Sequence, residues 1–139
     1  MRIMAIDYGD AHTGIAVSDP TGLLAGFTTT VDAWSPEAAA DKIAALAAEH
    51  AAEELVLGHP VNMDGTLGPR SEKARAMKAL LEERTGLPVV LWDERRTTID
   101  AHRILRNNGK DARKRKKTVD AVAASLILEG YLAYKKSRP

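Results

Sequence analysis

The chain carries its apolar residues as an ordered series of short strand-like runs and longer helix-like stretches, and few folds are compatible with that order. Three strand-like segments come first, at residues 2–7, 14–18 and 25–31. Two further short apolar runs, at 55–58 and 89–92, alternate with stretches whose apolar residues recur at helical spacing. This order predicts an α/β fold, with a mixed sheet of three antiparallel and then two parallel strands and helices on both faces. Because 139 residues suffice for one such domain and not for two, we expect a single domain.

Local signals place the ends of the predicted helices. Residues 35–36 (Ser-Pro) have the form of a helix start, with a capping hydroxyl followed by proline at the first helical position. Ser71 is predicted to cap a second helix, which ends at Gly86. Residues 97–100 resemble the capping box of a third helix. A basic loop is expected next, followed by a last helix with a regular apolar stripe over residues 119–131.

The composition excludes several classes of protein. Cysteine is absent, which excludes a disulfide scaffold, a thiolate zinc site and a cysteine nucleophile. No apolar run approaches the roughly 20 residues of a membrane helix. The first residues also lack the basic and then apolar pattern of a signal peptide. We therefore expect a cytoplasmic protein without a membrane partner.

The net charge of +1 conceals a strong asymmetry along the chain. Residues 1–69 carry a net charge of −8 and residues 70–139 carry +9. The positive half is concentrated in residues 106–117, which hold seven basic residues and one acidic residue. Such a segment is either a solvated basic surface or a site for a polyanion, and its position directly before a helix favours nucleic acid. Aromatic residues make up only 4% of the chain, which disfavours a protein that stacks single-stranded bases on aromatic side chains.

Acidic residues stand at three places where the predicted fold would keep a site. Asp7 ends the first strand-like run, and residues 93–94 (Asp-Glu) follow the last one. If these strands are parallel, their carboxyl ends meet at one edge of the sheet, where α/β proteins usually bind ligands. Alternation puts Asp93 and Glu94 on opposite sides, so only one of them is expected in a given site. Asp120 is predicted in the first turn of the last helix, at the margin of its apolar face.

Each of these acids also has a purely structural explanation. Asp7 can start a turn, the charges after residue 92 can form a surface salt-bridge cluster, and Asp120 can favour the helix dipole. Taken together, however, three carboxylates from separate elements suit Mg²⁺ or Mn²⁺ and not zinc. Such a set is typical of two-metal phosphodiester hydrolysis. The four histidines, by contrast, are too scattered for a metal site, and the roles of His12 and His59 stay open.

Several segments together resemble the YqgF family, whose members are also described as Holliday-junction-resolvase-like or as pre-16S rRNA nucleases. They are residues 7–19 (DYGDAHTGIAVSD), 58–66 (GHPVNMDGT) with 68–70 (GPR), 92–98 (WDERRTT) and 116–124 (KKTVDAVAA). The resemblance covers nearly the whole chain in order. The chain departs from the family at residues 11–12, where many relatives carry a basic pair, and at His59, where a leucine is usual.

The resemblance implies a ribonuclease-H-like fold and a divalent-metal nuclease with Asp7, Glu94 and Asp120 as its acidic triad. It further implies a role in maturation of the 5′ end of 16S ribosomal RNA in the bacterial cytoplasm. Side chains expected to hold the phosphates of structured RNA are Arg70, Arg95, Arg96, Lys110, Arg113, Lys114, Arg115, Lys116 and Lys117.

Three other functions are compatible with parts of the sequence. A DNA junction resolvase would need two sites and therefore a dimer, whereas the sequence is compatible with a monomer or a homodimer. A non-catalytic RNA-binding assembly factor would need the basic segment without the acids. An actin-like ATPase would bind nucleotide between two domains, and the chain supplies one. The expected function is therefore a Mg²⁺- or Mn²⁺-dependent nuclease, with the resolvase and the assembly factor as alternatives.

Overall fold

The computed structural model describes residues 2–9, 11–19, 25–60, 67–93 and 112–137. Its five strands form one sheet in the order β3-β2-β1-β4-β5. β1 pairs antiparallel with β2, and β2 antiparallel with β3, whereas β4 is parallel to both β1 and β5. The strands are β1 (Ile3–Asp7), β2 (His12–Ser18), β3 (Ala25–Asp32), β4 (Glu54–His59) and β5 (Val89–Asp93). The predicted mixed sheet, with three antiparallel strands followed by two parallel ones, is therefore confirmed.

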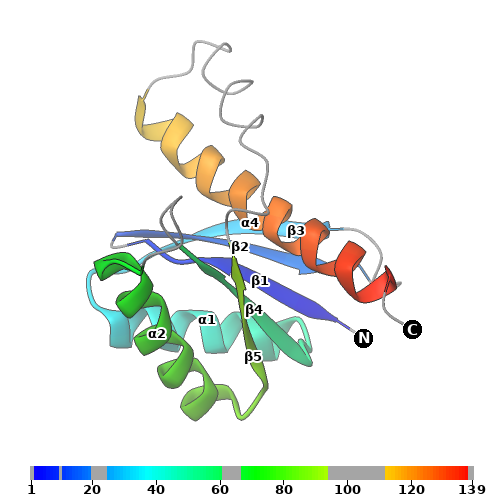
Figure 1. Cartoon of the computed structure of the whole chain (residues 1–139). Coiled ribbons are helices and arrows are strands. Elements are labelled where there is room, and N and C mark those ends of the chain that lie inside the picture. Colours follow the sequence, from blue (N-terminus) through cyan, green and yellow to red (C-terminus); the bar gives the residue numbers. More distant parts are fainter. Residues whose placement is uncertain (1, 10, 20–24, 61–66, 94–111, 138–139) are drawn as a thin grey trace.

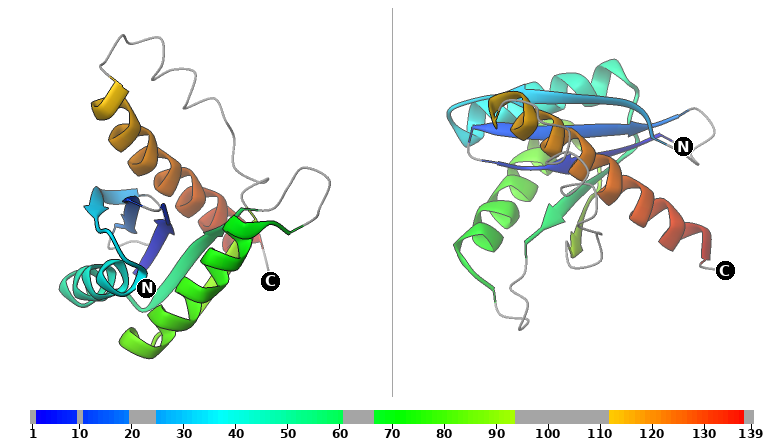
Figure 2. Two further views of the ribbon diagram at one scale, coloured as in Figure 1. Left: turned by 90° about the vertical axis from the view of Figure 1, so that its left-hand side faces the viewer. Right: turned by 90° about the horizontal axis from the view of Figure 1, so that it is seen from above.

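Helices cover both faces of this sheet, as the sequence predicts (Figures 1 and 2). α1 (Pro36–Glu49) and α2 (Pro69–Thr85) lie side by side on one face, and α4 (Ala112–Ser137) crosses the other. None of the helices within the described residues has an apolar stretch that would cross a membrane.

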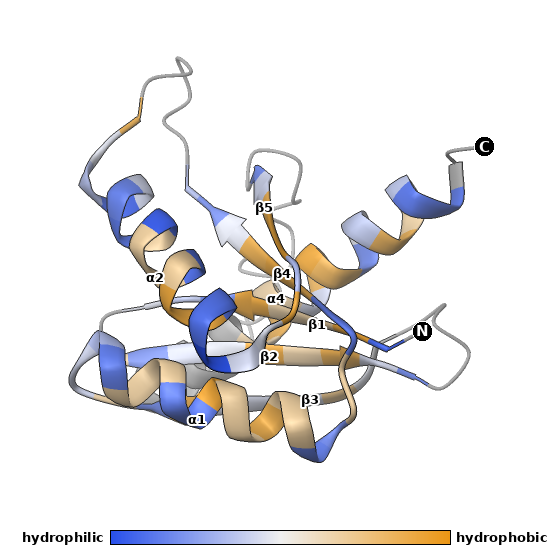
Figure 3. Ribbon diagram, turned by 90° about the horizontal axis from the view of Figure 1, so that it is seen from below, coloured by the Kyte–Doolittle hydropathy of each residue, from blue (hydrophilic) through white to orange (hydrophobic). Residues whose placement is uncertain are grey.

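The sheet separates two apolar cores. Between the sheet and α1 and α2, alternate strand residues such as Met4, Ile6 and Leu57 are fully buried. Between the sheet and α4, the intervening residues such as Ala5 and Val56 are buried in turn. Figure 3 shows the first arrangement from below, with the hydrophobic sides of α1 and α2 turned toward the strands. Successive strand residues point to opposite faces of the sheet. The core in which a strand residue is buried therefore shows which face its side chain lies on.

The first helix begins as its sequence predicts. The Ser35 hydroxyl accepts a hydrogen bond of 3.1 Å from the backbone N–H of Ala38, and Pro36 is the first helical residue. α1 is joined to α2 by a hydrogen bond of 2.5 Å from Arg84 Nε to Asp41 Oδ1. That bond raises the pKa of Arg84 above its usual value. The predicted end of α2 is also confirmed, because Gly86 takes the left-handed conformation that closes a helix.

The predicted cap of α2 is wrong. The helix begins at Pro69 with Gly68 at the capping position, and no side chain caps it. Proline fixes the backbone torsion that a first helical residue needs, so the helix starts three residues earlier than a cap at Ser71 would place it. Ser71 therefore lies inside the first turn, where its side chain is fully buried.

The last helix begins earlier than predicted, at Ala112. The expected basic loop is therefore helical from residue 112 onward, and Asp120 lies more than two turns into α4 instead of in its first turn. Lysine and arginine are good helix formers, and no glycine or proline interrupts residues 112–118, so the backbone preferences of these residues permit the extension. The helix-dipole explanation of Asp120 consequently fails. The helix predicted to start at residues 97–100 lies outside the described residues.

Candidate functional site

The three parallel strands end at one edge of the sheet, which we call the carboxyl edge. In the parallel register, Ile6 is the partner of Leu57, and His59 is the partner of Asp93. The last residues of β1, β4 and β5 are Asp7, His59 and Asp93, so all three lie along this edge. It is the edge at which the sequence predicts the site.

The alternation of strand residues divides these edge residues between the two faces. Ala5 belongs to the core under α4, so Asp7, two positions later, shares the α4 face. Leu57 belongs to the opposite core, and His59 follows it on the α2 face. Trp92 is buried under α4, which places Asp93 on the α2 face together with His59. Of these three edge residues, only Asp7 therefore faces the same side of the sheet as α4.

α4 runs antiparallel to β1 across the sheet. Its last turns lie at the start of β4, where Lys135 Nζ donates to Glu54 Oε1 at 3.2 Å. Its middle is held by a buried stripe that includes Ala124, Ile127 and Leu128. From there the amino-terminal half extends toward the end of the sheet at which β1 finishes (Figure 1). Position 120 lies one helical turn before Ala124, on the line of that stripe.

The connection from β1 to β2 folds tightly beside Asp7. A Cβ atom on Gly9 would lie 2.3 Å from the carbonyl oxygen of His12, which is closer than any real contact. His12 Nδ1 is in turn 2.7 Å from Asp32 Oδ1 on β3. This connection therefore depends on glycine at position 9 and is joined to the neighbouring strand.

We expect Gly9→Ala to misplace the segment after Asp7. The added methyl group meets backbone instead of a flexible side chain, so the loop itself must move. The nuclease activity that the sequence predicts should then fall by about tenfold or more, since small displacements of reacting groups are costly. Cleavage assays and urea unfolding would measure activity and stability. Gly130→Ala is the matched control, because its methyl group would lie 3.4 Å from the Trp92 side chain, an ordinary contact. Equal activity of the two variants would contradict the expectation.

His59 has a structural role that the sequence alone does not indicate. Its Nε2 atom is 2.5 Å from the hydroxyl oxygen of the buried Ser71, so it joins the end of β4 to the first turn of α2. The two residues are twelve positions apart along the chain, and no local pattern indicates their contact. Because His59 lies on the α2 face, its contact serves the placement of α2 and not the face that carries Asp7.

The other predicted site residues are placed to different extents. Arg70 is exposed in the first turn of α2. Backbone positions 113–117 form the first turns of α4, and position 120 follows them on the same helix. Glu94, Arg95, Arg96 and Lys110 lie outside the described residues. Within the described part of the chain, no three potential metal ligands cluster, and Asp7 is the only acid of the predicted triad whose side chain is described.

Comparison with known proteins gives consistent results over almost the whole chain. A family model described as RuvX, Holliday junction resolvase, matches residues 1–134. A protein of Halothermothrix orenii, provisionally named a pre-16S rRNA nuclease, is 43% identical over 134 residues, which cover 96% of each chain. A protein of Listeria innocua with the same name is 42% identical over 134 residues, covering 95% of this chain and 97% of that protein.

The fold is also found among solved structures. Thermus thermophilus RuvC, solved in complex with a Holliday junction substrate, has a TM-score of 0.63 and 14% sequence identity. The match covers 100% of this chain and 99% of that chain. At this identity the likeness shows a common, ribonuclease-H-like fold. From the family model and the close relatives together, it follows that the chain belongs to the RuvX family, also called YqgF.

Proposed function

We propose that this chain is a Mg²⁺- or Mn²⁺-dependent nuclease that hydrolyses phosphodiester bonds in the maturation of the 5′ end of 16S pre-rRNA. The observation that carries the proposal is the position of Asp7. It ends β1 at the carboxyl edge, on the face that α4 covers, in a chain of the RuvX family. We further propose that residues 1–139 act as one domain in the cytoplasm.

In this proposal Asp7, Glu94 and Asp120 hold the metal ions. Their donor chemistry fits, since carboxylate oxygens are the ligands that Mg²⁺ and Mn²⁺ prefer. Asp7 and α4 share one face of the sheet, which supports a site between them. When bound, such ions activate a water molecule and stabilise the leaving oxygen. The chain would supply three carboxylates, from Asp7 at the end of β1, from Glu94 after β5 and from Asp120 on α4.

The basic residues are proposed to hold the phosphates of structured RNA. Five of them occupy consecutive positions of α4, before position 120, in the half of the helix that extends toward the carboxyl edge. Contacts of this kind give affinity without sequence choice. The remaining proposed phosphate-binding residues are Arg70, Arg95, Arg96 and Lys110.

Neutralising part of the basic segment should weaken RNA binding and its dependence on salt. In the variant Lys114→Gln/Lys116→Gln/Lys117→Gln, up to three phosphate contacts are lost. The slope of log K against log salt should then fall in magnitude by up to about three, because each contact contributes nearly one. Titration of a labelled RNA in EDTA at several salt concentrations measures this. Lys73→Gln/Lys78→Gln, on α2, is the control with charges removed elsewhere. An unchanged slope in the α4 variant would contradict the prediction.

The function is tested by cleavage of two labelled substrates side by side, a 16S precursor 5′ end and a four-way DNA junction. Each is incubated with Mn²⁺, Mg²⁺ or EDTA, using the natural chain and Asp120→Asn. We expect metal-dependent cutting of the RNA that is lost in Asp120→Asn. The same behaviour on the junction alone would identify a resolvase.

Binding without cleavage under every condition would support the assembly-factor alternative. Because that outcome also arises when a ribosomal partner is missing, the assay is repeated with precursor 30S particles as substrate. Cleavage that persists undiminished in Asp7→Asn, Glu94→Gln and Asp120→Asn would overturn the assignment of the triad.

A further inference from the structure

β3 forms one edge of the sheet and, within the described residues, no strand lies beyond it. It is eight residues long (AGFTTTVD) and contains neither proline nor lysine, the residues with which exposed edges are usually protected. Three of its residues are threonine, which favours extended structure. Its register with β2 shifts only at the end near Ser18. The edge is therefore regular enough to pair with another strand.

The hydrogen bonds of β3 show which residues direct their backbone groups outward. The N–H of Ala33 donates to the carbonyl of Ala11, so this pair and every second pair along the register exchange bonds with β2. The intervening residues, among them Thr28 and Asp32, direct their N–H and C=O groups away from β2. The bond of 2.6 Å from Lys42 Nζ to the Asp32 carbonyl confirms that direction.

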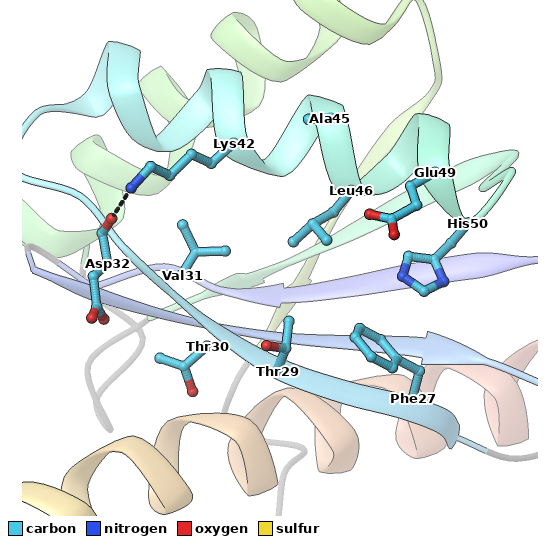
Figure 4. A pocket seen from close by; sticks show the side chains of 10 residues that line it. All are labelled: Phe27, Thr29, Thr30, Val31, Asp32, Lys42, Ala45, Leu46, Glu49 and His50. Carbon is cyan, nitrogen blue, oxygen red and sulfur yellow. Dashed lines mark hydrogen bonds between the residues drawn. The ribbon is translucent and has the colours of Figure 1, made fainter.

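A groove of about 610 Å³ runs along this edge, between the underside of β3 and the side of α1 (Figure 4). Phe27 lies at one end of it and is 39% exposed, and its ring contacts that of His50 in a tilted arrangement, at a centroid distance of 4.4 Å. Trp34, just beyond the other end of β3, is 91% exposed. Of the four large apolar side chains exposed among the described residues, two therefore belong to this edge.

The two ends of the groove carry side chains of opposite charge. Lys42 lies at the Asp32 end, and Glu49 lies at the Phe27 end (Figure 4). Among the described residues, no cation pairs with the Glu49 carboxylate. Lys42 uses one of its three ammonium protons on the Asp32 carbonyl, so it can still pair with an anion. A strand added antiparallel along β3 from a second copy would place Lys42 of each copy near Glu49 of the other.

We propose that β3 is the interface through which two copies of this chain form a symmetric dimer. The two β3 strands pair antiparallel about an axis at Thr29, so that Phe27 of each copy lies opposite Val31 of the other. An aromatic residue opposite a β-branched one is a favourable cross-strand pair. An interface with twofold symmetry requires that one surface be complementary to a second copy of itself. In this arrangement, the outward backbone groups of one β3 face those of the other, and Lys42 of each copy lies near Glu49 of its partner.

This dimer would contain one continuous sheet of both copies. Because the twofold axis is perpendicular to the sheet, both α4 helices lie on the same face, and the two carboxyl edges point in opposite directions. The inference does not depend on the proposed nuclease function, since it concerns the backbone edge of β3, whereas Asp7 ends β1.

The test is the association state of the full chain, measured by sedimentation equilibrium over a range of concentrations. We expect a reversible dimer. Thr28→Pro removes an outward N–H and leaves the bonds to β2 intact, and it enters the interface twice, so the dimer should weaken by about tenfold or more. Circular dichroism checks that this variant is folded.

A charge exchange keeps the test valid if Thr28→Pro is misfolded. Lys42→Glu and Glu49→Lys should each weaken the dimer, and the double variant Lys42→Glu/Glu49→Lys should restore it, because the pairs form again with reversed signs. The proposal is overturned by a chain that stays monomeric at all concentrations. It is equally overturned by a dimer that is insensitive to Thr28→Pro or to the exchange.

Discussion

Asp7→Asn is expected to reduce cleavage of the RNA substrate by at least about a hundredfold while leaving RNA binding intact. Loss of a residue that hydrogen-bonds to a metal ligand already lowers metal affinity or activity by about 10–100-fold. Loss of the charge of a ligand itself should lower activity further. Asparagine has the size of aspartate but not its charge, so β1 should pair with β2 and β4 as before. Binding measured in EDTA should stay equal or become tighter, because one negative charge facing the phosphates is removed. Single-turnover cleavage and titration of labelled RNA measure the two effects separately.

Asp93→Asn is the matched control for this experiment. Asp93 ends β5 at the same edge of the sheet as Asp7, but it lies on the α2 face. The same chemical change at nearly the same height in the sheet should therefore leave cleavage within a few-fold of the natural chain. If Asp93→Asn were inactive and Asp7→Asn active, the site would lie on the α2 face, and the assignment of α4 to the site would be wrong.

The fold was predictable because its signals are local and repeated. Short apolar runs such as 55–58, bounded by turn residues, gave strands, and Ser35 with Pro36 gave the start of α1. The structure differs from the prediction where one residue type has two local roles. Serine is a common capping residue, but α2 begins at Pro69, two residues before Ser71. Ser71 is instead buried within the first turn, where it contacts His59. The charge of the basic segment favours a loop, although lysine and arginine form helices readily.

The part of the candidate site that was predictable from the sequence is the part that follows from the alternation of side chains between the two faces of a strand. A carboxylate at the end of β1 indicates an edge position, and the period of two separates Asp7 from Asp93. The contact between His59 and Ser71 and that between Phe27 and His50 join residues far apart along the chain. They depend on how helices pack against the sheet. No local pattern contains that information, and the same holds for the groove beside β3.

Leu128→Ala is expected to impair both stability and catalysis through the docking of α4. Leu128 is fully buried between α4 and the sheet, in the cluster that contains Val56 and Trp92. Truncation of a buried leucine leaves a cavity and costs about 2–5 kcal/mol in the free energy of unfolding. Because α4 also carries position 120, loosened docking should lower the cleavage rate of the molecules that remain folded. Urea unfolding and cleavage under conditions where circular dichroism shows a folded chain measure the two effects.

Leu81→Ala separates these two effects. Leu81 is also fully buried, but it lies on α2, in the core on the opposite face of the sheet. Its loss should lower the free energy of unfolding by a similar amount, while the folded molecules keep their cleavage rate. A comparable loss of rate in both variants would mean that general stability, and not the placement of α4, limits catalysis. A loss of cleavage rate confined to Leu128→Ala would instead show that catalysis depends on the contact of α4 with the sheet, because that contact positions the helix that carries Asp120.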